Sequence, residues 1–308
     1  MIEVPGQHAH RPRTLPDLTR HLLTGTELDR GELLALLDRA DALKSAPLSS
    51  RALEGRSVAL IFEKHSTRTR LSFEAGVFEL GGHPIVLRSG ELHLARGESV
   101  GDTARVLSRH VAAIGVRTGP DALLRELAQA SAVPVFNMLT AGHHPCQALA
   151  DLMTLREEFG RLEGLRIAYV GDGNNVARSL ALVGATAGVE VALASPAAYA
   201  LTGETAGAQL YEDPAEAVAG AHAVYADVWV SMGDEDSADA RRAALGRYRL
   251  DDALLDLAAP GAIALHCLPA HPGEEITADV LYGPRQRIWE QAENRRHAQK
   301  ALLEALVR

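Results

Sequence analysis

The sequence predicts an α/β protein with two doubly wound domains, each built on a parallel sheet with helices on both faces. The chain has 308 residues, a length that suits two domains that each bury their own core. Short apolar runs of strand length alternate with helical segments through both halves, as expected for parallel sheets. The composition, 47% apolar and 23% charged residues, is typical of a soluble globular protein.

In the first half, an amphipathic helix is expected over 33–43, followed by alternating strands and helices. The run SVALIF at 57–62 is continuously apolar, which is typical of a strand buried on both faces. After Thr67 a helix is expected to continue to the Gly81-Gly82 pair, which ends it. Further strands are expected at 85–87, 112–116 and 133–137, with helical segments at 103–111 and 121–130. A long helix over 145–159 joins the two halves.

The second half repeats the same alternation. Strands are expected at 165–171, 189–195, 222–227 and 262–268, with helices near 175–187, 213–219 and 251–258. The polar stretch 233–247 is expected to be a mobile loop, and 285–308 to be one long helix. The chain therefore divides into a mobile N-terminal arm (1–16), a first domain (17–150), a second domain (151–284) and the C-terminal helix (285–308).

Charge and cysteine content restrict the class of protein. The formal net charge of −9 argues against nucleic-acid binding, although a few arginines in one cleft can still bind a small anion. Two cysteines without a CxxC spacing indicate free thiols in a reducing compartment. The first residues lack the apolar segment of a secretory signal, and no apolar run approaches the roughly 20 residues that cross a bilayer. We therefore expect a cytoplasmic protein without membrane contact.

A cluster of hydrogen-bonding residues follows the strand 57–62. Ser66, Thr67 and Thr69 offer hydroxyl groups, and Arg68 and Arg70 offer guanidinium groups that fit phosphate oxygens. The turn leads into a helix, whose N-terminus favours anions. The alternative is an N-capping Ser or Thr followed by solvated arginines, and the glycine-rich P-loop pattern is absent. The pattern favours an anion site at this turn.

Other positions allow a functional and a structural interpretation. The turn GDGNN at 171–175 lacks the third glycine of a dinucleotide-binding turn, so nucleotide binding is not expected. The neighbours His266 and Cys267 suggest a thiol nucleophile, but adjacent residues on a strand face opposite sides, which argues against covalent catalysis. His144 before Pro145 and Asp227 at a strand end are, in isolation, more often a cap or a turn than part of a ligand site.

Taken together, six segments resemble one known family. They are STRTR (66–70), HPCQALAD (144–151), GDGNN (171–175), DVWVSMG (227–233), HCLPAHPGEE (266–275) and QAENRRHAQKALL (291–303). In order and spacing they resemble the aspartate and ornithine carbamoyltransferase superfamily, over nearly all of residues 17–308. DVWVSMG together with HCLP resembles the ornithine branch.

The resemblance implies transfer of the carbamoyl group from carbamoyl phosphate to the side-chain amine of L-ornithine, giving citrulline and phosphate in arginine metabolism. It implies a carbamoyl-phosphate domain at 17–150, an ornithine domain at 151–284, and a C-terminal helix that packs back on the first domain. It also implies a homotrimer, or an assembly of trimers, with active sites at subunit interfaces. Neither a metal nor another cofactor is expected, so catalysis would be positioning and preorganised electrostatics.

The resemblance also assigns roles to individual residues. Phosphate is expected to bind Ser66, Thr67, Arg68, Thr69, His93 and Arg295. The carbonyl oxygen is expected to accept from Thr69, Arg117 and His144. The carbamoyl NH₂ group is expected to bind Gln147 and the Leu268 carbonyl. Ornithine is expected to bind Asn175, Asp227, Ser231 and Met232. Cys267 is expected beside the ornithine amine, as an orienting group and proton acceptor. The catalytic candidates are therefore Arg117 and His144 at the carbonyl oxygen and Cys267 at the amine. A cis bond is expected before Pro269.

Three positions depart from the family pattern. His93, in the loop 91–98 that reaches a neighbouring subunit, stands where Gln is usual; Ala141 replaces an Asp, and Pro272 replaces an Arg. These departures leave two alternatives open. One is a carbamoyltransferase for a related amine, such as putrescine or an N-acylated ornithine. The other is a catalytically weakened paralogue that acts as a regulatory binding module.

Overall fold

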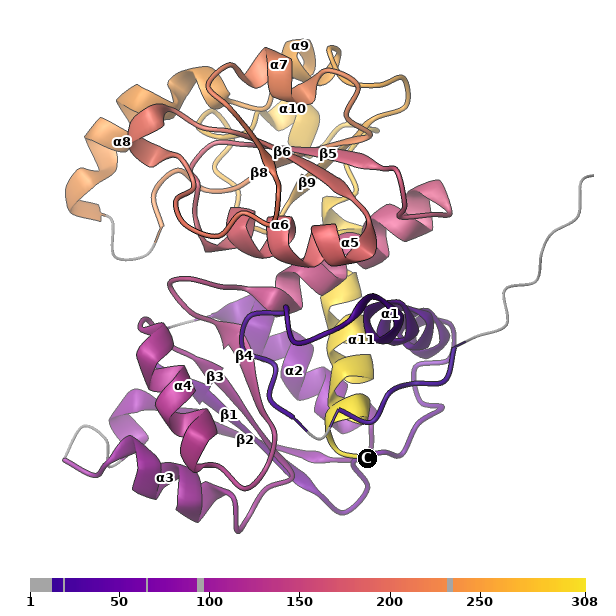
Figure 1. Ribbon diagram of the computed structural model, residues 1–308, viewed down its shortest axis with the longest axis vertical. Coiled ribbons are helices and arrows are strands. Elements are labelled where there is room, and N and C mark those ends of the chain that lie inside the picture. The colour runs from indigo at the N-terminus through magenta and orange to yellow at the C-terminus, as the bar shows by residue number, and fades with distance from the viewer. Residues whose placement is uncertain (1–12, 19, 65, 93–96, 232–234) are drawn as a thin grey trace, which may run out of the picture.

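The computed structural model describes residues 13–308 except 19, 65, 93–96 and 232–234, so most of the expected N-terminal arm lies outside the described residues. It contains two parallel sheets, one in each half of the chain (Figure 1). The long helices α5 (Pro145–Phe159) and α11 (Ile288–Leu306) lie where the two halves meet. This architecture confirms the predicted fold class.

The first sheet has the strand order β2-β1-β3-β4. Its strands are β1 (Ser57–Phe62), β2 (His83–Arg88), β3 (Ala113–Arg117) and β4 (Val135–Leu139). The helices of this half are α1 (Arg30–Ser45), α2 (Thr67–Glu79), α3 (Val100–Leu107) and α4 (Asp121–Ala130). Along β1, Val58 and Leu60 belong to one buried cluster and Ala59 and Ile61 to another, so both faces of the strand are covered.

The second sheet has the strand order β7-β6-β5-β8-β9, again all parallel. Its strands are β5 (Arg166–Val170), β6 (Glu190–Ala194), β7 (Gln209–Tyr211), β8 (Ala223–Ala226) and β9 (Ile263–His266). Its helices are α6 (Asn175–Ala187), α7 (Pro214–Val218), α8 (Ala238–Leu245), α9 (Asp252–Leu255) and α10 (Ala278–Leu281). Ile167 and Ala168 lie in different buried clusters, so this sheet is also covered on both faces.

Helix α11 connects the two halves at the end of the chain. It leaves the second half and packs on α1, α2 and α5, as the yellow helix in Figure 1 shows. Lys300 is fully buried there, and its Nζ donates to the carbonyl of Leu43 at 3.2 Å and to Glu79 at 2.5 Å. The expected return of the C-terminal helix to the first half is therefore confirmed.

The stretch 233–247 was predicted to be a loop, and this prediction is wrong where α8 runs from Ala238 to Leu245. Only Leu245 of this helix is buried, but the segment is rich in Ala and Arg, whose helix propensity was a signal that could have predicted it. The three-residue edge strand β7 and the four-residue α10 were also not predicted. No helix within the described residues is long and apolar enough to cross a membrane.

Candidate active site

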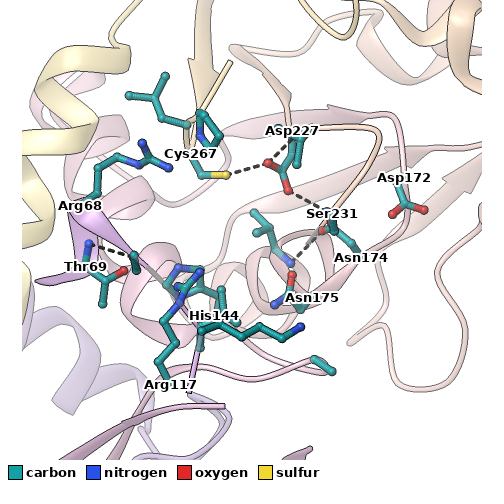
Figure 2. A pocket seen from close by; sticks show the side chains of 18 of the residues that line it. Arg68, Thr69, Arg117, His144, Asp172, Asn174, Asn175, Asp227, Ser231 and Cys267 are labelled. Atoms are coloured by element: carbon teal, nitrogen blue, oxygen red, sulfur yellow. Dashed lines mark hydrogen bonds between the residues drawn. The ribbon is translucent and has the colours of Figure 1, made fainter. Parts of the chain in front are cut away.

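A cleft of about 870 Å³ opens between the two sheets (Figure 2). It lies beyond the carboxyl ends of β1, β3, β5, β8 and β9, the edge at which open α/β sheets bind ligands. Its walls bring together most of the predicted site residues: Ser66, Thr67, Arg68, Thr69, Arg117, His144, Asn175, Asp227, Ser231, Cys267, Leu268 and Arg295. His93 and Met232 lie outside the described residues.

The turn between β1 and α2 forms one end of the cleft. Ser66 is the N-cap of α2, and its Oγ accepts from the Thr69 backbone N–H at 3.3 Å. The helix therefore points its N-terminus at the cleft, where Arg68 also lies. Arg70 instead forms an ion pair with Glu74 at 2.7 Å. The capping interpretation is confirmed for Ser66, and the anion site at this turn stays a prediction.

Arg117 at the end of β3 and Arg295 on α11 bring two further guanidinium groups to the cleft. They are 7% and 3% exposed, and their Nε atoms have no hydrogen-bond partner among the described residues. Burial and the neighbouring charges of Arg295 and Arg68 lower the pKa of Arg117 to about 10, so it is still a cation at neutral pH. Because buried cations are unfavourable without a compensating charge, this end of the cleft favours an anionic ligand.

His144 is the N-cap residue of α5 and is 4% exposed. Its backbone N–H donates to Ser179 Oγ at 2.6 Å, which fixes the start of the helix. Burial, together with the charges of Arg295 and Arg117, lowers the pKa of the imidazole well below its usual value. His144 is therefore neutral, and its ring can donate one hydrogen bond toward a ligand oxygen.

Gln147 does not line the cleft. Its Oε1 accepts from Arg295 Nη1, and its Nε2 donates to Asp151 Oδ1 at 2.8 Å. Arg295 Nη2 in turn donates to Thr69 Oγ1 at 2.7 Å. Gln147 therefore supports a cleft-lining arginine from behind, and its contact with a carbamoyl group stays a prediction.

Asp227 follows β8 and lines the cleft beside Cys267. Its Oδ1 accepts from the Cys267 thiol and from the Val228 N–H, each at 2.8 Å, and its Oδ2 accepts from Asn174 Nδ2 at 2.7 Å (Figure 2). Burial and the adjacent carboxylate raise the pKa of Cys267 well above its usual value. The thiol is therefore protonated and acts as a donor, which argues against both a thiolate nucleophile and the expected proton acceptor.

The GDGNN turn leads into α6, and its two asparagines have different tasks. Asn174 is the N-cap, and its Oδ1 accepts from the backbone N–H groups of Val176 and Ala177. Asn175 lines the cleft and donates to the Thr140 carbonyl at 2.6 Å, which links the two halves. Asn174 was missed in the sequence, although an Asn directly before a helix is itself an N-cap signal.

The segment that follows β9 completes the cleft. Leu268 has a positive φ of 62°, and the Leu268–Pro269 peptide bond is cis, as the sequence led us to expect. Two further cleft residues were missed: Asp172 and Arg241 form an ion pair at 2.9 Å. Arg241 lies on α8, in the stretch that was wrongly predicted to be a loop, so it was not considered as a cleft residue.

Among the described residues, two groups of side chains have possible metal ligands within 4.8 Å of one another, namely Asp227, His266 and Cys267, and His271, Glu274 and Glu275. In the first group the Cys267 thiol donates to Asp227, and both ring nitrogens of His266 have hydrogen-bond partners in Leu268 and Glu275. Internal hydrogen bonds therefore account for the geometry of this group.

Comparison with known proteins identifies the family. The family model described as "Aspartate/ornithine carbamoyltransferase, carbamoyl-P binding domain" matches residues 20–157, and "Aspartate/ornithine carbamoyltransferase, Asp/Orn binding domain" matches residues 163–306. The chain belongs to the aspartate/ornithine carbamoyltransferase family.

Within this family, the chain is similar to proteins named for the ornithine branch. It is 52% identical to the ornithine carbamoyltransferase of Parafrankia sp., over 94% of this chain and 96% of the relative. It is also 52% identical to that of Acidothermus cellulolyticus, over 94% of this chain and 97% of the relative. The solved ornithine carbamoyltransferase from Pyrococcus furiosus superimposes with a TM-score of 0.90 at 43% identity, covering 96% of this chain and 98% of that one.

Proposed function

We propose that the protein transfers the carbamoyl group of carbamoyl phosphate to the side-chain amine of L-ornithine, forming citrulline and phosphate. The observation that carries this proposal is the polarity of the cleft. Arg68, Arg117 and Arg295 form a cationic part of the cleft, and the carboxylate of Asp227 beside the Cys267 thiol forms an acidic part whose charge also acts on Arg68. An anionic donor and a cationic amino acid fit these two parts. The relatives' names supply the identity of both substrates.

In the cationic part, the proposed ligand is the phosphate group. Ser66, Thr67 and Arg68 at the N-terminus of α2 would bind its oxygens together with Arg295. Arg117, neutral His144 and Thr69 would donate to the carbamoyl oxygen, where negative charge develops in the transition state. Each such donor is typically worth about 3–4 kcal/mol of transition-state stabilisation.

In the acidic part, Asp227 would bind the α-ammonium group of ornithine, with Asn175, Ser231 and Met232 around the amino-acid backbone. The side-chain amine must lose a proton before it attacks, although the pKa of such an amine is about 10.4 in water. The positive charges of Arg68, Arg117 and Arg295 disfavour a further positive charge in the cleft and so lower the pKa of the bound amine. Because the Cys267 thiol is protonated, we assign it the orientation of the amine and not its deprotonation.

The biological setting is also a proposal. We propose residues 17–150 and 151–284 as the carbamoyl-phosphate and ornithine domains, arginine metabolism as the pathway, and the cytoplasm as the location. Both cysteines are free, which suits a reducing compartment. We propose a homotrimer, or an assembly of trimers, with His93 reaching the neighbouring site. Leu71 and Phe78 on α2 are 61% and 73% exposed, which supports a protein interface on this helix. Sedimentation equilibrium at the mass of a single chain would contradict it.

The activity test is direct. Purified protein is incubated with carbamoyl phosphate and ornithine at several pH values from about 7 to 9, and citrulline and phosphate are measured. Equal amounts of both products are expected. Parallel reactions with putrescine and with N-acetylornithine test the acceptor, because the first lacks the α-carboxylate and the second lacks the charge that Asp227 would bind. Faster turnover of either amine, or no product with ornithine at any pH, would contradict the proposal.

A further inference from the structure

The segment Cys267–His271 needs support from outside the cleft. Cys267, Leu268 and His271 line the cleft, and the Leu268 backbone has a φ of 62°. This left-handed conformation is unfavourable for a residue with a branched side chain, and it persists in proteins only where neighbouring groups hold it. The question is which groups hold Leu268.

The buried side chain of His266 provides this support. Its Nδ1 accepts from the Leu268 backbone N–H at 2.8 Å, while its Nε2 lies 3.2 Å from Glu275 Oε1. Because Nδ1 accepts a hydrogen bond, the ring proton is on Nε2 and points at the carboxylate. Both side chains are completely buried, so water cannot replace either contact.

The same carboxylate oxygen also holds the far end of the segment. Glu275 Oε1 accepts from the His271 backbone N–H at 2.5 Å. On the other side, the His266 backbone N–H donates to Gln291 Oε1 on α11 at 2.9 Å. His266 therefore connects α11, the Leu268 backbone and Glu275, although the residue itself does not line the cleft.

We propose that His266, oriented by Glu275, is a positioning residue for carbamoyl transfer. Its Nδ1 fixes the Leu268 backbone and so keeps Cys267 and Leu268 in place at the wall of the cleft. The expected change in kcat/KM rests on the proposed function. The expected change in the position of the Cys267 thiol does not rest on it.

Two substitutions separate the contacts of the ring. In His266→Asn the amide oxygen can lie near the position of Nδ1 and still accept from Leu268, whereas in His266→Gln the amide group extends to the position of Nε2. For H266Q, kcat/KM should fall about tenfold or more, because a buried backbone N–H loses its acceptor. H266N should lose much less. The inhibition constant of inorganic phosphate, which reports the turn at Ser66, should stay within about twofold in both variants.

A matched control distinguishes positioning from general destabilisation. His222 Nδ1 likewise accepts a backbone N–H, that of Arg166 at 3.0 Å, but at the opposite end of the second sheet. His222→Gln should lower the unfolding temperature without changing kcat/KM. If H222Q and H266Q lower kcat/KM equally, the positioning role is wrong.

A second readout does not depend on enzymatic activity. Cys146 is completely buried, so the reaction with dithiobis(nitrobenzoate) reports Cys267. The thiol should react several-fold faster in H266Q than in the parent protein, and at nearly the parent rate in H266N and H222Q. Equal rates in H266Q and H266N would overturn the inference whether or not citrulline forms. If wild-type protein forms no citrulline but the thiol rates differ as expected, only the proposed function fails.

Discussion

Asp227→Asn tests how the acidic part of the cleft recognises its ligand. The substitution keeps the size of the side chain but removes its charge. Removing the charge of one partner of a buried charge pair typically costs about 2–3 kcal/mol of binding free energy. This loss corresponds to a rise in the KM for ornithine of about 30- to 140-fold. The KM for carbamoyl phosphate should change much less, because the proposed phosphate contacts are made by Ser66, Thr67, Arg68 and Arg295 and not by Asp227.

The structure adds a second consequence of this substitution. If the new amide keeps its oxygen toward Val228 and Cys267, its NH₂ group faces Asn174 Nδ2, which is also a donor. Rotating the Asn174 amide would relieve this conflict, but its Oδ1 would then no longer cap α6. Loss of such a cap costs about 0.5–2 kcal/mol, so the variant should also be less stable.

Initial rates of citrulline formation with each substrate varied in turn give both KM values, and thermal unfolding gives the stability. Asn174→Ala is the matched control, because it removes the cap and the contact to Asp227 but keeps the carboxylate. It should lower the unfolding temperature with a much smaller rise in the KM for ornithine. If D227N folds and raises this KM less than about threefold, or raises both KM values equally, Asp227 is not the group that binds the α-ammonium.

Three further predictions concern other parts of the molecule. Arg68→Ala should raise the inhibition constant of phosphate about tenfold or more, whereas Arg70→Ala, which removes an ion pair with Glu74, should leave it unchanged; equal effects would refute the assignment of the turn. Cys267→Ser should raise the KM for ornithine more than the inhibition constant of phosphate, and equal rises would contradict its place beside the amine. Burial raises the pKa of Asp151 to about 7, so the folded state binds a proton that the unfolded state releases near pH 4. The free energy of unfolding, measured with urea, should therefore fall relative to Asp151→Asn as the pH rises from about 4 to 7; a constant difference would contradict this pKa.

The strand, turn and helix around Ser66 could be predicted from the sequence because their causes are local. The apolar run of β1 requires cover on both faces, and Ser66 caps the helix that follows it. The same holds for Asp227 and Cys267, which follow strands and meet where the carboxyl ends of neighbouring parallel strands lie side by side. In these places the position in the chain determines the position in space.

The partners of buried polar side chains depend on the tertiary structure. The amide of Gln147 is held between Arg295, far along the chain, and Asp151 on its own helix, and the sequence did not predict these two partners. Arg241 reaches the cleft from a helix of which only Leu245 is buried, and its ion pair with Asp172 joins residues that are far apart in the chain.

By itself, the sequence determined the two α/β units, the helix start at Ser66 and, through its motifs, the family. The protonated state of Cys267, the support of Arg295 by Gln147 and the fixation of Leu268 by His266 were decided only in the folded chain. The physical reason is that a hydrogen bond or a pKa shift depends on the few atoms within about 3–6 Å of a group. In this protein, many of those atoms belong to residues that are distant in the sequence.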